Sequence, residues 1–363
     1  MSEQRFGARV RSLRVSVPDE QLADLHHRLL ATRWPDVEGL RSRGVPVFRL
    51  RSIVHHWLHH YDWRAREGLF NAFGGYSTVI DDSVVDFLHV RSSRSDALPI
   101  LLLHGWPGSV LEFEGVIRSL AEPAGPGAEE WPAFHVVVPC LPGSSFSLTA
   151  AFPGWSLPRT VSAWSGLMQR LGYDRWVAHG GASGAKIAAQ LGLQGPEGLV
   201  GIHLVPYDDS VVGPAEPHAI DSHVWDVALG DSPAGLAAWM LEAWTPWPDS
   251  DAEQALVVDH VLDSVMMYWL AAANSPVRDR RRLLEEGATG LLTVPVGCSD
   301  FSHRTRSSDE IWTGLSCRDL FYWNEPGPAA RFPAIEQPDV LVSELRRCFA
   351  TRSRWTSALA GEP

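Results

Sequence analysis

The sequence predicts an α/β protein whose main domain is built on a mostly parallel β-sheet. Two observations carry this prediction. Short apolar runs alternate with helix-like stretches over residues 76–206, which is the pattern of parallel strands joined by crossover helices. Two glycine-rich corners, at residues 104–109 and 179–184, each follow an apolar run and precede a helix-like stretch. Both corners are therefore predicted to be strand–turn–helix junctions.

The same patterns divide the chain into four segments. Residues 1–75 form an N-terminal extension that opens with a strand-like run at 13–18 and continues with helical leucine periodicity. Residues 76–206 and 291–363 are the two parts of the core. Residues 207–290 lose the strand signal and carry prolines between short helices, which predicts a helical lid over the carboxyl ends of the strands. The strand candidates are 84–90, 100–103, 135–139, 176–178, 199–204, 291–296 and 320–323.

Composition limits the function classes. A chain of 363 residues with net charge −12 is long enough for a large core and too acidic for nucleic acid or anionic membranes as partners. No stretch approaches the roughly 18 apolar residues of a membrane span, and the first residues lack a signal-peptide core. We expect a cytoplasmic protein. The four cysteines have no metal-binding or disulfide spacing, so we expect reduced thiols.

Four histidines in six residues, at positions 55, 56, 59 and 60, raise the question of a metal site. Their segment has helical spacing, and Trp57 and Leu58 would face a core. No carboxylate nearby completes a ligand set. We therefore predict an amphipathic helix, no metal site and no cofactor.

The second corner has the shape of a nucleophile elbow without its nucleophile. Counted as Gly-x-Nu-x-Gly from Gly180, the nucleophile position is Ala182. A methyl group cannot attack carbon. A one-residue slip would instead make Ser183 a serine nucleophile, at the cost of reversing the faces of the preceding strand. That alternative stays open.

The chain resembles the microsomal-type epoxide hydrolases of the α/β-hydrolase superfamily over nearly its whole length. The segments that carry the resemblance are 17–19, 32–35, 62–64, 87–92, the HGWPGS corner at 104–109, 141–147, 231–239 and 336–338. The resemblance implies an α/β-hydrolase fold with a mostly parallel, eight-stranded sheet, a helical lid and an epoxide-hydrolase-type N-terminal extension.

The resemblance also implies a mechanism. An aspartate opens the epoxide to an alkyl-enzyme ester, a His–acid pair activates water, and two lid tyrosines protonate the leaving oxygen. This sequence departs at each position: Ala182 stands for the nucleophile and Arg331 for the histidine. The acid position falls near Arg304, with Asp300 and His303 close by, and the tyrosine positions fall near Pro214 and near Asp279 or Arg280.

Half of the catalytic apparatus is expected to survive. The HGWP corner should present the Trp106 N–H, and the elbow should present the Ser183 N–H, toward a developing oxyanion. Without a nucleophile beside it, such a hole suits an enolate or a phenolate. This favours proton transfer, aldol or Michael addition, or cyclisation.

The predicted catalytic residues are Trp106, Ser183, Asp300 and Arg331. Arg331 would pair with a phenolate or carboxylate of the substrate, or else form a salt bridge that fixes the last loop. The predicted substrate-binding residues, several of which are aromatics that would otherwise belong to the core, are His104, Phe146, Ala182, Tyr207, Trp225, Tyr268, His303, Arg304 and Trp323.

The leading hypothesis is a cofactor-independent, non-hydrolytic biosynthetic enzyme, similar to α/β-hydrolase relatives of actinomycete natural-product pathways. It would form C–C bonds in, cyclise or rearrange a large aromatic, polyketide-like small molecule of the anthraquinone or enediyne type. Two alternatives stay open, a non-catalytic small-molecule binding protein and a divergent hydrolase that uses Ser183. The substrate and the oligomeric state are not determined by the sequence.

Overall fold

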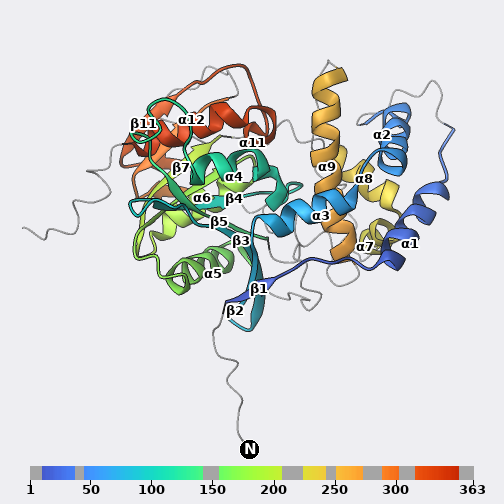
Figure 1. Ribbon diagram of the computed structural model, residues 1–363, viewed down its shortest axis with the longest axis horizontal. Helices are drawn as coiled ribbons and strands as arrows, with labels where there is room; N and C mark the ends of the chain where they lie inside the picture. Colours follow the sequence, from blue (N-terminus) through green and yellow to red (C-terminus); the bar gives the residue numbers. More distant parts are fainter. Residues whose placement is uncertain are drawn as a thin grey trace, which may run out of the picture.

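The computed structural model describes residues 10–36, 45–141, 155–206, 224–242, 251–272, 288–301 and 315–350. It contains a sheet-based core and a layer of helices beside it (Figure 1). In the described part of the chain no helix is both long and apolar enough to span a membrane.

The core is a nine-stranded sheet with the order β1-β2-β3-β5-β4-β6-β7-β9-β11. The strands β4, β5, β6, β7, β9 and β11 are parallel to one another, whereas β1, β2 and β3 add antiparallel pairs at one edge. The α/β-hydrolase fold expected from the sequence is confirmed. The strands are β1 (Arg11–Leu13), β2 (Gly75–Ile80), β3 (Ser83–Val90), β4 (Leu98–Leu103), β5 (Phe134–Pro139), β6 (Trp176–Gly181), β7 (Leu199–Val205), β9 (Val296–Ser299) and β11 (Leu320–Asn324).

Three details of the predicted sheet are wrong. The sheet has nine strands in the described residues, because β1 pairs with the edge strand β2. Of the run at 13–18 only Leu13 lies in a strand, as the last residue of β1. Side chains of the helix α3 (Trp63–Ala72) hold the residues that follow, because Asn71 and Glu67 accept from the Val15 and Val17 N–H. The run at 291–296 is interrupted at Pro295, which has no N–H for a ladder. Its first half is β8 (Gly290–Leu292), which pairs with β10 (Leu315–Cys317) in a separate small sheet.

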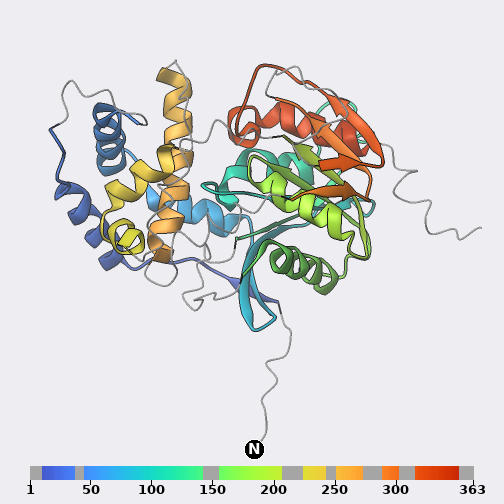
Figure 2. The same ribbon diagram turned by 180° about the vertical axis from the view of Figure 1, so that it is seen from behind.

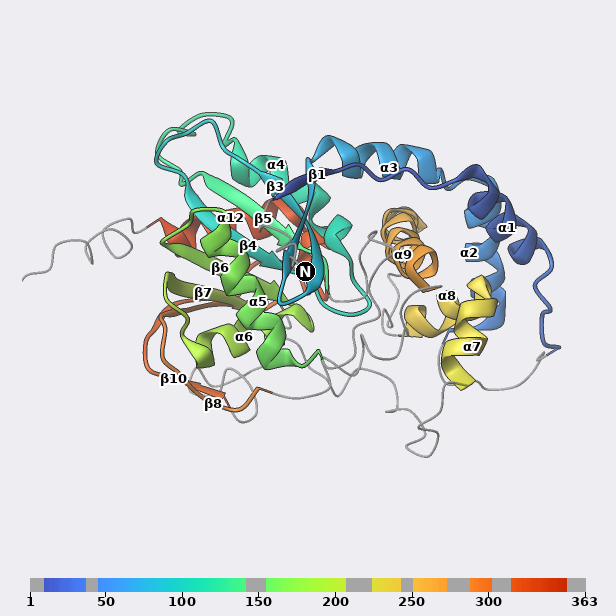
Figure 3. The same cartoon turned by 90° about the horizontal axis from the view of Figure 1, so that it is seen from below.

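Helices cover both faces of the sheet. The view from below separates α4 and α12 from α5 and α6 (Figure 3). The first pair packs together on one face, and α6 lies along β6 and β7 on the other. The central strands of the sheet are therefore buried on both faces, as continuous apolar runs such as 100–103 predict. The elements are η1 (Val110–Phe113), α4 (Glu114–Ala121), α5 (Leu157–Arg170), α6 (Gly184–Gln194), α11 (Pro333–Glu336) and α12 (Pro338–Phe349).

The N-terminal extension and the lid form one helical layer (Figures 1 and 2). Both α1 and α2 contact the lid helix α8, and Arg28 pairs with Asp231 at 2.8 Å. The extension thus supports the lid, although the domain boundaries predicted from the sequence stay a prediction. The helices are α1 (Asp19–Leu30), α2 (Val47–His59), α7 (Val224–Asp231), α8 (Pro233–Glu242) and α9 (Asp251–Ala272).

Buried polar groups tie the sheet to α12. Ser299 donates to the Glu344 carboxylate at 2.8 Å, so its oxygen accepts from His203 Nε2–H at 3.0 Å. The other ring nitrogen of His203 then accepts from His179 Nδ1–H, also at 3.0 Å. Both imidazoles are therefore neutral. Burial lowers the pKa of His203 to about 3 and that of His179 well below its usual value.

The neutral histidine pair predicts acid sensitivity. A histidine with a lowered folded-state pKa stabilises the protein fully above pH 6.5, and this stabilisation is lost as the pH falls toward the folded value. Between about pH 7.5 and 5.5 the free energy of unfolding should fall by on the order of 1 kcal/mol through His203, and His179 should lower it further in the same direction. Urea denaturation at both pH values tests this. An unfolding free energy that stays constant would mean that the imidazoles are protonated in the fold.

Candidate active site

The turn between β6 and α6 is a strained corner with Ala182 at its apex. Ala182 has φ of +48°, a left-handed conformation that is uncommon for a residue other than glycine. Glycines on both sides make the corner possible. A Cβ at Gly180 would lie 2.4 Å from the Gly184 carbonyl oxygen, and one at Gly184 would lie 2.0 Å from that of Leu103. These contacts place position 182, and not 183, where an elbow presents its nucleophile.

Ser183 is not at the apex. It has right-handed backbone angles, φ −70° and ψ −16°, as the residue before α6. Its hydroxyl accepts from the Trp106 N–H at 2.9 Å and donates to the Trp106 carbonyl at 2.7 Å. The slip that would make Ser183 the elbow nucleophile is therefore wrong. Ser183 instead joins the elbow to the HGWP corner.

The same contact corrects the predicted oxyanion hole. The Trp106 N–H was expected to point toward substrate, but its acceptor is Ser183 Oγ. The corner approaches closely enough for this only because residue 105 is glycine, since a Cβ there would lie 2.2 Å from Ser183 Oγ. In this structure, then, the serine hydroxyl occupies one donor of the hole.

His104 holds the corner in place and does not bind substrate as predicted. Its Nε2 accepts from the Leu141 N–H, and its Nδ1 donates to the Gly105 carbonyl, both at 3.2 Å. The ring is buried, and burial lowers its pKa to about 4. Both ring nitrogens are hydrogen-bonded to the backbone. The neutral imidazole therefore connects the end of β4 to the segment that follows β5.

Two residues near the corner were not singled out from the sequence. Trp239 of the lid helix α8 lies over Trp106, with 4.6 Å between the ring centroids. Glu112 reaches back onto Gly108, where a Cβ would lie 2.0 Å from Oε2. Burial raises the pKa of Glu112 well above its usual value, which favours the neutral acid. The pattern Ser109-x-x-Glu112 was an available signal, because it matches a capping box.

The structure brings Asp300 and Arg331 onto neighbouring segments. Asp300 follows β9 and is fully buried. The next residue, Phe301, accepts from the Ala330 N–H at 3.1 Å, which sets the segment of Arg331 beside that of Asp300. Glu336 fixes the Arg331 backbone by accepting its N–H at 2.8 Å. Both residues therefore lie at the carboxyl side of the sheet, as the sequence predicted.

The structure describes the side chains of two of the remaining predicted residues. Tyr268 is fully buried in α9. Trp323 lies on β11, the outermost strand, with β7 and β9 between it and β6. At about 4.8 Å per strand this is roughly 14 Å from the elbow strand, and its role in substrate binding stays a prediction. Trp225 lies in α7, where its side chain is not described, and Phe146, Tyr207, Pro214, Asp279, Arg280, His303 and Arg304 lie outside the described residues.

The Ser183 contact gives a stability prediction. Ser183→Ala should lower the free energy of unfolding by about 1–2 kcal/mol, because it removes two hydrogen bonds between the corners. Urea denaturation measures the change. Ser162→Ala is the matched control, since the Ser162 hydroxyl donates to the Pro158 carbonyl within its own exposed helix turn. This substitution should change the free energy of unfolding by less than about 0.5 kcal/mol. Equal effects of the two substitutions would show that the contact between the corners contributes nothing.

Comparisons with known proteins agree with this architecture. Residues 10–113 match the family described as epoxide hydrolase N terminus, and residues 99–226 match the α/β hydrolase fold. A protein of Stigmatella aurantiaca named "Putative epoxide hydrolase" is 40% identical, over 93% of this chain and 84% of its own. Epoxide hydrolase 1 of the rabbit Oryctolagus cuniculus is 25% identical over 93% of this chain and 88% of its own.

The fold itself is shared with a solved structure. Juvenile hormone epoxide hydrolase from the silkworm Bombyx mori superposes with a TM-score of 0.79 at 23% identity, covering 97% of this chain and 95% of that one. The extension, the core and the lid are thus common to both proteins. With the sequence match to the Stigmatella protein, these findings show that the chain belongs to the epoxide hydrolase family of the α/β-hydrolase superfamily.

Proposed function

We propose that this protein is a cofactor-independent, non-hydrolytic enzyme on the epoxide hydrolase scaffold. Its reaction would be a proton transfer, a C–C bond formation, or a cyclisation or rearrangement through an oxyanion such as an enolate or phenolate. The substrate class would be a large, planar, polyketide-like molecule, of the anthraquinone or enediyne type.

The methyl group of Ala182 at the strained apex carries this proposal. Opening an epoxide through an enzyme ester needs a carboxylate at that position, and releasing the ester needs a base. Position 331, which the family resemblance assigns to the base, holds a guanidinium that stays protonated at any working pH. At these two positions the chain therefore has neither the carboxylate that would form the ester nor the base that would activate water to hydrolyse it.

The contact between Trp106 and Ser183 supports an oxyanion ligand. The N–H of Trp106 donates to a neutral hydroxyl, and a bond to a charged oxygen is roughly twice as strong as such a neutral bond. A phenolate or enolate can therefore replace Ser183 Oγ as the acceptor. The ligand would enter beneath the lid residue Trp239, whose ring contact with Trp106 provides an aromatic surface for a planar molecule.

One observation favours a second candidate, a binding protein without catalysis. The hydroxyl of Ser183 both accepts from and donates to the Trp106 backbone, which is a stable arrangement without any ligand. If the oxyanion site never opens, the scaffold retains only a binding surface. Conversion of a hydroxyanthraquinone or its reduced, enolisable form, monitored by mass spectrometry, separates an enzyme from a binding protein.

Incubation with styrene oxide tests the loss of hydrolysis. The purified protein should form no diol above the buffer rate, because position 182 has no nucleophile. Ala182→Asp should then form an adduct without turnover: the carboxylate oxygen bonds to an epoxide carbon, the C–O bond breaks, and the alkoxide takes a proton from water. Intact mass should rise by one epoxide, and the ester should persist because Arg331 cannot act as a base.

Ala182→Asn is the matched control, because asparagine tolerates the left-handed backbone as aspartate does and forms no ester. Diol formation by the unmodified protein, or many turnovers by Ala182→Asp, would contradict the assignment of positions 182 and 331.

Arg331 is proposed to pair with the substrate oxyanion. Arg331→Met should reduce hydroxyanthraquinone binding or turnover on the order of a hundredfold, equivalent to about 2–4 kcal/mol. Circular dichroism and the melting temperature should stay near those of the parent protein. Arg347→Met is the control, since Arg347 is largely exposed on α12 and pairs with Glu344. A lower melting temperature with unchanged binding would make Arg331 a structural residue.

A further inference from the structure

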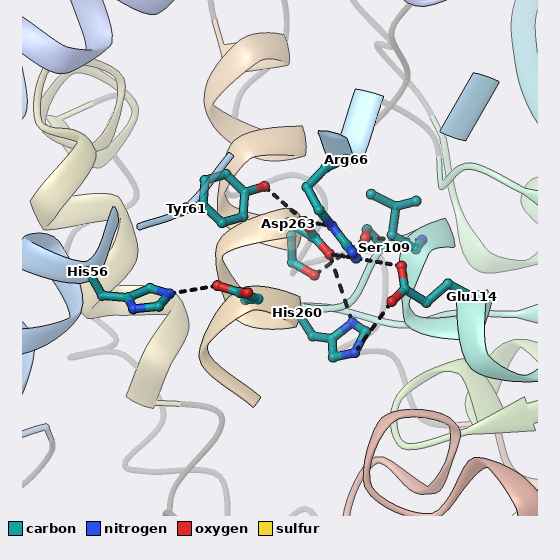
Figure 4. A network of polar contacts seen from close by, with 10 residues as sticks. His56, Tyr61, Arg66, Ser109, Glu114, His260 and Asp263 are labelled. Atoms are coloured by element: carbon teal, nitrogen blue, oxygen red, sulfur yellow. Dashed lines mark hydrogen bonds and ion pairs between the residues drawn. The ribbon is translucent and has the colours of Figure 1, made fainter. Parts of the chain in front are cut away.

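A second polar cluster lies apart from the elbow, where three distant segments meet. Arg66 comes from α3, Glu114 is the first residue of α4, and His260 and Asp263 are one turn apart on the lid helix α9. Their side chains converge on one another (Figure 4). The cluster thus joins the extension, the core and the lid.

Arg66 binds one set of carboxylate oxygens. Its Nε donates to Asp263 Oδ1 at 2.7 Å, and its Nη2 donates to Glu114 Oε2 at 2.5 Å and to Asp263 Oδ2. Tyr61 also donates to Asp263 Oδ1, at 2.8 Å. The Asp263 side chain is only 1% exposed. One guanidinium therefore faces two carboxylates in a buried place, and the group as a whole carries one negative charge in excess.

His260 faces Glu114 Oε1 and Asp263 Oδ2, and the second of these oxygens also accepts from Arg66 Nη2. Its Nε2 lies 3.8 Å from Glu114 Oε1 and its Nδ1 lies 3.8 Å from Asp263 Oδ2, both too long for hydrogen bonds. The residue is 9% exposed, and Nδ1 has no hydrogen-bond partner within the described part of the chain. Burial lowers the pKa of His260, which leaves a neutral ring with a lone pair among carboxylates.

We propose that Glu114, His260 and Asp263 form a binding site for a divalent metal ion, with Zn²⁺ the ion that this ligand set favours. One ligand atom from each residue lies within 4.8 Å of the others. An imidazole nitrogen and carboxylate oxygens are ordinary zinc ligands at about 2.0–2.2 Å, so closure of the three side chains by about 1 Å completes the set. A cation there also offsets the buried excess of negative charge.

Arg66 is compatible with the metal as an outer partner. It holds Glu114 through Oε2 and Asp263 through both carboxylate oxygens. Glu114 Oε1 can therefore turn to the ion, and Asp263 Oδ2 would bind the ion through its second lone pair while it still accepts from Arg66. Hydrogen bonds from such second partners orient metal ligands in many sites. The site would fasten α9 to α4 beside Ser109 of the HGWPGS corner, whose hydroxyl already accepts from Ser264 of α9 at 3.4 Å. This role is independent of the proposed function.

The experiment must first remove a competing surface site. The rings of His55, His59 and His60 lie together on α2, with centroids 4.5 Å apart for the first pair and 6.1 Å for His55 and His60. Imidazole nitrogens are ordinary zinc ligands, so neighbouring exposed rings would compete for added ion. The measurements are therefore made in the full chain carrying His55→Gln, His59→Gln and His60→Gln.

In this background we expect one Zn²⁺ per chain after dialysis, measured by elemental mass spectrometry, and a melting temperature that rises with Zn²⁺ and falls with EDTA. His260→Gln should weaken Zn²⁺ binding by at least about 100-fold. His56→Gln is the matched control, because His56 pairs with Asp259 of α9 at 2.7 Å and is not one of the three proposed ligands, so it should retain the metal.

Absence of bound zinc in the background, or full binding by His260→Gln, would overturn the proposal. The Co²⁺ absorption spectrum of the background protein covers the case in which His260→Gln does not fold, since it needs no substitution in the cluster. Intense visible bands of low-coordinate Co²⁺ are expected, and their absence likewise rejects the site.

Discussion

The contact between two glycine corners is the constraint on which the site depends. Leu103 and Gly184 approach until a single Cβ could not fit between them, and Gly105 approaches Ser183 in the same way. No side chain separates the two corners. The Ser183 hydroxyl, next to the strained Ala182, can therefore bond the Trp106 backbone directly. Any group at the apex of the elbow, catalytic or not, therefore faces the HGWP corner at a fixed distance.

Burial then determines which groups near these corners carry charge. The neutral forms of His104, His179 and His203 are favoured, because burial lowers the pKa of each ring. Both ring nitrogens of His104 and of His203 also bond neutral partners. Burial likewise favours the neutral acid of Glu112. The residues beneath the elbow thus form a rigid, uncharged support. Arg331, placed beside the segment of Asp300, brings a guanidinium to the carboxyl side of the sheet.

The lid is connected to this support by two different kinds of contact. Near the elbow the contact is aromatic, between Trp239 and Trp106. Farther out it is ionic and largely buried, between Arg66, Glu114 and Asp263. The second contact includes the N-terminal extension, because Arg66 belongs to α3, so it joins the extension, the core and the lid of this chain. A ligand that moves the lid must act against both contacts.

The sequence by itself determined the class of fold and the position of the elbow. Apolar runs such as 100–103 are typical of strands that are buried on both faces. The glycines around Ala182 predict a tight corner, because such a corner has no room for a larger residue. The sequence did not predict the short strand β1 or the break at Pro295. The pairing of an edge strand and the end of a ladder both depend on neighbours far along the chain.

Only the tertiary structure decided what the polar side chains do. Ser183 bonds Trp106, which lies 77 residues away in the chain, and His104 accepts from the Leu141 N–H just beyond β5. Trp323 lies on the strand at the far edge of the sheet. The cluster of Arg66, Glu114, His260 and Asp263 has no local spacing to reveal it, because its members come from three segments that meet only after folding. Periodicity records which face of an element is apolar, whereas a hydrogen bond between distant segments depends on where the folded chain places them.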